Sequence, residues 1–195
     1  MKKSTTEKKG GNKRNFLFPS SSVFFLFIAL SGFQIVEDRA KVPILSPNFA
    51  DRQIAKLKLD NGLKAYLISD PLIPQSAAAL SIEAGSWHDP EKYPGMAHFL
   101  EHMLFMGSAA FPDESEYSAF IRDHGGKENA VTMADRTIYA FSADHNAFSG
   151  ALNRFSHFFI DPLFSPHTME KELHAIDEEY ALHIEEDHWR EILFP

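Results

Sequence analysis

The sequence predicts an α+β domain in which strands and helices follow one another along the chain. Three observations support this fold class. Short segments alternate polar and apolar residues, longer segments lack helix breakers, and the two kinds of segment are interleaved. We find no internal repeat, and low-complexity sequence is confined to the first 22 residues. The chain therefore reads as one layered domain behind a distinct amino-terminal segment.

The strands are predicted from alternation and from the turns between them. Residues 54–59 alternate polar and apolar side chains, as a half-buried strand does. The sequence Asp60-Asn61-Gly62 then supplies a tight turn into the next strand, which is typical of a β-hairpin. The expected strands are residues 54–59, 63–68, 76–84, 130–133 and 137–142.

The helices are predicted from their length and from glycine and proline at their ends. Pro94 and Gly95 introduce the first helix, and Gly107 closes it. The second helix is stopped by the pair Gly125-Gly126. The expected helices are residues 96–106, 114–123, 148–159 and 168–189.

The first helix carries the most informative motif, His98-Phe99-Leu100-Glu101-His102. Residues four apart share one face of a helix, so His98 and His102 can direct a ring nitrogen at the same point. Zinc accepts such nitrogens, and a catalytic zinc usually takes three protein ligands and a water. Glu101 lies beside that point and could take a proton from the water. The order His-x-x-Glu-His is a known zinc-peptidase pattern.

A second interpretation of this motif is a surface helix with solvated histidines. The chain has 10 histidines, so the pattern can arise by chance. The neighbours of the motif, however, are apolar on almost every side, and such a helix is buried. Buried imidazole and carboxylate groups need partners, because burying them unpaired is costly. A shared metal ion would supply the partner.

A third ligand could come from Glu172 or Glu179. They are seven residues apart, which is almost two helical turns, so both carboxylates point the same way. One could bind the metal while the other holds a ligand in place. A solvated acidic helix face explains the same residues, and spacing alone does not choose between the two.

Several motifs in order resemble a known family. They are the pentapeptide, the run from Gly125 to Ala130, the Glu172 and Glu179 pair, and the pair Trp189-Arg190. Over residues 54–190 the chain resembles the inverzincin (M16) metallopeptidases of the pitrilysin and insulin-degrading enzyme group. The resemblance implies an antiparallel-rich sheet layered with helices.

The resemblance also implies a zinc-dependent endopeptidase site. It makes His98, His102 and Glu179 the ligands of one Zn²⁺ ion and Glu101 the general base. Two neutral imidazoles and one carboxylate leave such a site with a net positive charge, which lowers the pKa of bound water. Glu101 could then accept the proton of that water and pass one to the leaving amine.

The remaining implied roles concern the surroundings of the metal and the substrate. Glu172 becomes a carboxylate near the ligands. Asn129 and Ala130 match the stretch that lies along the bound peptide. An extended peptide could pair there with a sheet edge and be recognised mainly through its backbone.

The amino-terminal segment has the composition of a targeting signal. The first 31 residues hold six of the 19 basic side chains, and an apolar run at 23–30 is followed by Ser31 and Gly32. Basic, apolar and small residues in this order are typical of a secretory signal, and the run is far shorter than the ~20 residues of a membrane span. We expect a signal-like segment at 1–31, a linker at 32–50, a zinc-peptidase domain at 51–195, and a secreted or periplasmic location.

Charge and cysteine content exclude other classes. The formal net charge is −8, although the first 31 residues are basic, so the rest of the chain is strongly acidic. An acidic domain is a poor partner for nucleic acid. The chain has no cysteine, which excludes disulfides, thiolate metal sites and a cysteine nucleophile.

The length of the chain departs from the family. The resemblance implies enzymes several times longer, built from four related domains around a chamber, or halves contributed by separate chains. This chain matches an incomplete amino-terminal domain that carries every implied ligand. Three hypotheses follow. The first is a zinc endopeptidase acting on peptides, either with a partner chain or as the opening part of a longer ancestor. The second is a truncated remnant that binds metal or peptide without turnover, and the third is a purely structural acidic domain.

Overall fold

The computed structural model describes residues 32–37 and 52–183. Backbone contacts divide the chain into two compact units. The first contains a three-stranded sheet in the order β1-β2-β3, and the second contains another in the order β4-β6-β5 with the helices. Strands and helices are interleaved, and the predicted α+β class is confirmed.

The first unit is built around the predicted hairpin. Its strands are β1 (Phe33–Ile35), β2 (Gln53–Leu59) and β3 (Lys64–Ser69). The turn between β2 and β3 uses the positive φ of Gly62 (91°), and the Asn61 side chain accepts a hydrogen bond from the Leu63 amide at 3.0 Å. Both residue types favour such a turn. Strand β1, which pairs antiparallel with β2, lies in the segment expected to be a linker.

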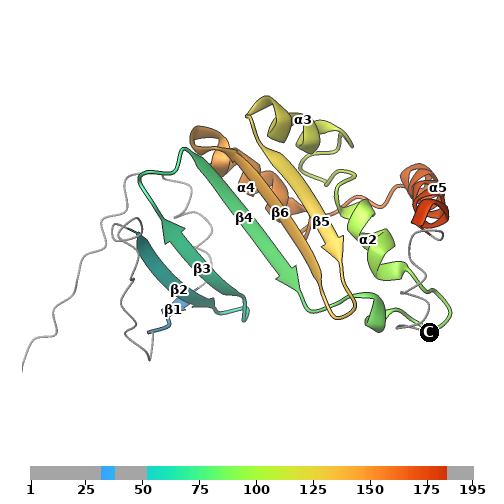
Figure 1. Ribbon diagram of the computed structural model, residues 1–195, viewed down its shortest axis with the longest axis horizontal. Helices are drawn as coiled ribbons and strands as arrows, with labels where there is room; N and C mark the ends of the chain where they lie inside the picture. Colours follow the sequence, from blue (N-terminus) through green and yellow to red (C-terminus); the bar gives the residue numbers. More distant parts are fainter. Residues whose placement is uncertain (1–31, 38–51, 184–195) are drawn as a thin grey trace, which may run out of the picture. The chain divides into compact units, whose positions relative to one another are not determined.

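The sheet of the second unit is antiparallel throughout. It comprises β4 (Gln75–Ile82), β5 (Lys127–Thr132) and β6 (Thr137–Asp144), with β6 in the centre (Figure 1). The prediction starts β5 at residue 130, whereas the strand begins three residues earlier. The polar side chains at 127–129 conceal the strand in the sequence, and polar residues are common on edge strands because they discourage unwanted pairing.

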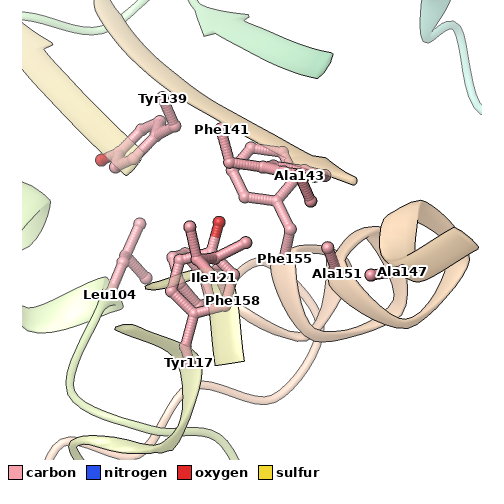
Figure 2. Packing of buried hydrophobic residues seen from close by; sticks show 10 residues of the cluster. All are labelled: Leu104, Tyr117, Ile121, Tyr139, Phe141, Ala143, Ala147, Ala151, Phe155 and Phe158. Atoms are coloured by element: carbon pink, nitrogen blue, oxygen red, sulfur yellow. The ribbon is translucent and has the colours of Figure 1, made fainter. Parts of the chain in front are cut away.

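One face of this sheet carries the hydrophobic core. Along β6 the alternate residues Tyr139, Phe141 and Ala143 are buried, as the two-residue period of a strand requires. Figure 2 shows them packed against side chains from the helices. The helix and loop members of this cluster are Leu104, Tyr117, Ile121, Ala147, Ala151, Phe155 and Phe158.

Within the described residues, four α-helices cover this face or border it. They are α2 (Met96–Leu104), α3 (Glu116–Asp123), α4 (Phe148–His157) and α5 (Pro166–His183), with short 3-10 turns η2 (Ser86–His88) and η3 (His145–Ala147). Helix α2 contacts both β5 and α5 (Figure 1). The four predicted helices are therefore present, with ends that differ by a few residues, and the part of the last one beyond 183 lies outside the described residues.

The start of α2 is held by a carboxylate from the preceding loop. The Asp89 side chain accepts hydrogen bonds from the amides of Gly95 (2.7 Å) and Ala97 (2.8 Å). These amides have no partner within the helix, and a carboxylate there also interacts favourably with the helix dipole. Gly95 adopts a positive φ of 86°, which glycine tolerates without strain. The loop thus sets where the metal-motif helix begins.

Some predictions concern residues whose structure is not described. The targeting segment at 1–31 and the pair Trp189-Arg190 lie outside the described residues, so the signal and the secreted or periplasmic location stay predictions. Within residues 32–37 and 52–183, no helix has the length and apolar character needed to cross a bilayer.

Candidate metal centre

Helix α2 brings the two histidines of the pentapeptide together. The Nε2 atoms of His98 and His102 are 3.3 Å apart, and the rings meet edge to face with centroids 4.8 Å apart. This geometry follows from their spacing of four residues on one helix face.

The third member of the cluster comes from α5. The Oε2 atom of Glu179 lies 3.8 Å from His98 Nε2 and 3.5 Å from His102 Nε2. Glu179 is 77 positions beyond His102, so the tertiary structure is required to join the cluster. Among the described residues, no other set of three histidine, aspartate or glutamate side chains is grouped closely enough to hold a metal.

The three atoms have the spacing of zinc ligands. Tetrahedral ligands at about 2.0–2.1 Å from zinc are separated from each other by about 3.3–3.4 Å. The observed separations of 3.3, 3.5 and 3.8 Å are close to this value. The side chains are 24–43 % exposed, so water can reach the cluster. The donor set therefore fits a zinc ion with three protein ligands and an open fourth position.

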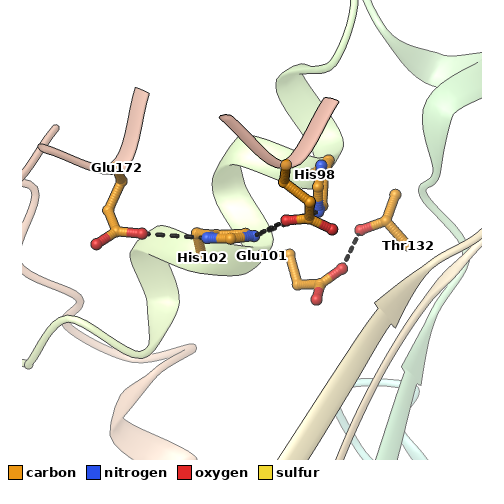
Figure 3. Close-up of polar contacts among 6 residues, drawn as sticks. His98, Glu101, His102, Thr132 and Glu172 are labelled. Atoms are coloured by element: carbon orange, nitrogen blue, oxygen red, sulfur yellow. Dashed lines mark hydrogen bonds and ion pairs between the residues drawn. The ribbon is translucent and has the colours of Figure 1, made fainter. Parts of the chain in front are cut away.

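Glu172 orients one of the histidines. Its Oε2 atom lies 3.1 Å from His102 Nδ1, on the side of the ring away from His98 (Figure 3). An ionised carboxylate can only accept a hydrogen bond, so Nδ1 carries the proton and Nε2 presents its lone pair to the cluster. Carboxylate partners of this kind fix the tautomer of metal-binding histidines.

Glu101 lies on the sheet side of the same helix and is 8 % exposed. Its Oε2 atom accepts a hydrogen bond of 2.5 Å from the hydroxyl of Thr132 on β5 (Figure 3). Burial, together with the negative charge of Glu101, raises the pKa of Tyr139 above its ordinary value, so the phenol stays neutral. Thr132 is not among the residues predicted from the sequence, although it follows Ala130 by two residues and so shares a strand face with it.

The open edge of β5 runs past this group. The Met133 amide donates to the Arg136 carbonyl at 2.8 Å, which makes these two residues a hydrogen-bonded pair at the hairpin. Such pairs alternate along antiparallel strands, so the backbone groups of Ala130 and Thr132 point away from β6. No other described strand pairs with that edge.

Asn129 and Ala130, the expected substrate-binding residues, have opposite orientations on β5. Ala130 packs its side chain against the core, and Asn129 has an exposed side chain on the other face. Ala130 therefore offers backbone groups to the open edge, whereas Asn129 directs its backbone to Ala140 of β6.

Four other histidines among the described residues have structural partners. They are His88, which accepts from the Gly85 amide, His124, which contacts the Phe120 carbonyl, His145, which contacts Ser76, and His157, which contacts Asp161. A pocket of about 510 Å³ also borders α2. On this helix it is lined by Met96, Ala97, Leu100 and Leu104, and by none of the three clustered residues. The metal cluster is thus a separate feature.

Several known proteins are similar to this chain in sequence. The family model described as Insulinase (Peptidase family M16) matches residues 64–194. The chain is 44% identical over 146 residues to the A-factor-processing enzyme of Saccharomyces cerevisiae, covering 75% of this chain and 14% of that protein. It is 43% identical over 139 residues to the insulin-degrading enzyme of Homo sapiens, covering 71% and 14%. It is 42% identical over 144 residues to the putative zinc protease mug138 of Schizosaccharomyces pombe, covering 74% and 15%.

A solved structure agrees with these matches. The crystal structure of pitrilysin has a TM-score of 0.71 and 33% identity to the chain, over 78% of this chain and 16% of that one. Fold, cluster and relatives together define a peptidase-type domain with two histidines and a glutamate at one point. Within that class, the chain belongs to the insulinase family, peptidase family M16. It spans about 14–15% of the length of these curated relatives.

Proposed function

We propose that this domain is the zinc-binding catalytic part of a metalloendopeptidase that hydrolyses peptides. The observation that carries the proposal is the cluster of His98, His102 and Glu179, with Glu101 on the same helix. His98, His102 and Glu179 would hold the zinc, and Glu172 would keep His102 in the binding tautomer. When bound, zinc would polarise the substrate carbonyl and make water acidic enough to attack near neutral pH.

The chain's own residues would divide the remaining work. Glu101 would accept the proton of the attacking water and deliver it to the leaving amine. The outward backbone groups of Ala130 and Thr132 would pair with an extended peptide, so that recognition depends mainly on the peptide backbone. The exposed side chain of Asn129 would contact the peptide from the neighbouring position.

The test combines metal content with peptide cleavage. We expect the purified chain to bind about one zinc ion per molecule, as the three-ligand cluster implies, and to cleave a quenched fluorescent peptide. Glu101→Gln is expected to keep the zinc and abolish cleavage, because the amide cannot accept the proton. Glu178→Gln, on an exposed position of α5, serves as the matched control and should retain both. A chain without zinc, or a Glu101→Gln variant with full activity, would refute the proposal.

A second candidate is a domain that binds zinc and peptides without turnover. The chain spans only 14–15% of the length of these relatives, so zinc binding and peptide cleavage are tested separately. A different case is a domain that cleaves peptides only when a second polypeptide supplies the other half of a substrate chamber. If the chain binds zinc without cleaving peptides, and a separately produced carboxyl-terminal half from a relative restores cleavage, then only a partner is missing. No cleavage in either case would support the silent domain.

A further inference from the structure

We propose that Thr132 is a positioning residue that holds the carboxylate of Glu101 toward the cluster of His98, His102 and Glu179. The inference rests on the proposed function, since it concerns the base of that reaction. Its first observation is the 2.5 Å hydrogen bond from the Thr132 hydroxyl to Glu101 Oε2. One carboxylate oxygen is thereby occupied, and the other is left for water.

The surroundings of Glu101 make this contact important. Its side chain is 8 % exposed, so bulk water does little to orient it. A buried carboxylate is costly unless it is hydrogen-bonded, and hydrogen bonds to ionised groups are stronger than those between neutral ones. A base must also lie within hydrogen-bond reach of the proton it abstracts. A fixed rotamer of Glu101 therefore matters more for turnover than for substrate binding.

The same residue belongs to the strand expected to bind the peptide. Thr132 pairs with Thr137, the last strand pair before the turn between β5 and β6. Its backbone groups point to the open edge of β5. The hydroxyl of Thr137 is used elsewhere, since it donates to the Ala84 carbonyl at 2.8 Å. Thr132 thus links the open edge of β5, where the peptide would bind, to the proposed base Glu101. Its partner Thr137 instead links β6 to the residues that follow β4.

Three variants test the role in the full chain. Thr132→Val keeps the shape and the β-branched side chain but removes the hydroxyl, Thr132→Ser keeps the hydroxyl, and Thr137→Val is the matched control. We expect Thr132→Val to lower kcat about 10-fold or more with KM changed by less than about 2-fold, because the lost contact acts after substrate binding. Thr132→Ser should recover most of kcat. Thr137→Val should keep kcat, and zinc content should be the same in all four proteins.

A second measurement needs neither zinc nor turnover. In the metal-free chain, Thr132→Val should lower the urea midpoint more in the wild-type background than in a Glu101→Leu background, since the partner is already absent there. Thr137→Val should have equal effects in both backgrounds. If Thr132→Val does not fold, Thr132→Cys replaces it, because a thiol is a weak donor.

The outcomes separate this inference from the proposed function. Wild-type kcat in Thr132→Val, loss of kcat in Thr132→Ser as large as in Thr132→Val, or equal midpoint shifts in both backgrounds would overturn the role of Thr132. A chain that binds zinc but does not cleave peptides would overturn the proposed function instead. The midpoint measurement would then still decide whether Thr132 holds Glu101.

Discussion

At the scale of single residues, the contact between Glu172 and His102 decides which ring nitrogen faces the cluster. The carboxylate accepts a hydrogen bond from Nδ1 at 3.1 Å, so Nε2 is available as a ligand before any ion arrives. This arrangement makes the site partly organised in the metal-free chain.

We therefore expect Glu172→Gln to weaken zinc binding about 10–100-fold, the range found for partners of metal-binding histidines. The neutral amide is a weaker acceptor, so the binding tautomer is less favoured. Competition with a chromophoric chelator measures the affinity, and Glu178→Gln on the same helix is the control. An unchanged affinity in Glu172→Gln would show that the contact does not prepare the ligand.

The candidate site was only partly accessible from the sequence. His98, Glu101 and His102 could be predicted, because helix geometry alone places residues three and four apart on neighbouring positions. Glu172 and Glu179 were ambiguous, since an acidic helix face has the same pattern. Thr132 could not be predicted, because its partner depends on how β5 lies beside α2 in the folded chain.

At the scale of single elements, α2 depends on the loop before it. The Asp89 side chain accepts hydrogen bonds from the amide of Gly95, which precedes the helix, and from the amide of Ala97 in its first turn. To bind zinc through His98 and His102, this helix would need a defined start, since fraying would displace His98.

Asp89→Ala is expected to lower the free energy of unfolding by about 0.5–2 kcal/mol, the usual cost of losing a helix cap. Urea denaturation of the metal-free chain measures this, and exposed Glu91→Ala in the same loop is the control. Equal stability of the two variants would mean that α2 is held by its packing and not by the cap.

A second element is anchored by the close approach of Gly85 to the β5–β6 hairpin. A Cβ atom at Gly85 would lie 2.1 Å from the Met133 carbonyl oxygen and 2.6 Å from the Arg136 amide nitrogen. The amides of Ser86 and Trp87 also donate to this hairpin, at 3.0 and 2.8 Å. The loop after β4 therefore fixes the end of β5 near Thr132.

Gly85→Ala should destabilise the chain by about 1–3 kcal/mol, as overpacking does, because backbone atoms cannot yield as a side chain can. Thermal unfolding measures the loss. Gly126 provides a comparison, since a Cβ atom there would lie 1.9 Å from the Ser142 carbonyl oxygen, and Gly126→Ala should also destabilise. A neutral Gly85→Ala would contradict this account of the hairpin.

Most elements were predictable, but their ends were not. The helices and the central strands have strong periodic patterns, and the structure contains them near the expected positions. β1 is three residues long, too short for a period to be visible. The first three residues of β5 are polar, so only their pairing with β6 reveals them as a strand.

At the scale of the whole molecule, the cluster of His98, His102 and Glu179 draws its members from two helices, α2 and α5. Thr168 is the one buried residue among those of α5 whose side chains are described, and the face that carries Glu172 and Glu179 also carries the half-buried Met169 and Ile176. A bound metal ion would therefore strengthen the existing contact between α2 and α5.

Zinc should slow amide hydrogen exchange in α5 and leave α4 unchanged, because α4 is held by the core. Saturation at about 100 times the dissociation constant should also stabilise the chain by about 2.7 kcal/mol. Mass spectrometry of the exchanged chain measures the first effect and thermal unfolding the second. His98→Ala should remove both, and exchange in α5 that ignores zinc would contradict a ligand on this helix.

The separation of the ligands along the chain has a consequence for biosynthesis. His98 and His102 leave the ribosome first, followed by the β5–β6 hairpin, and Glu179 emerges only after a further 77 residues beyond His102. Before that moment a nascent chain offers two imidazoles and no closing carboxylate. Under the proposed function, zinc capture would thus wait until the hairpin that contacts Glu101 exists, and a ribosome-bound chain stalled before residue 179 would retain zinc poorly.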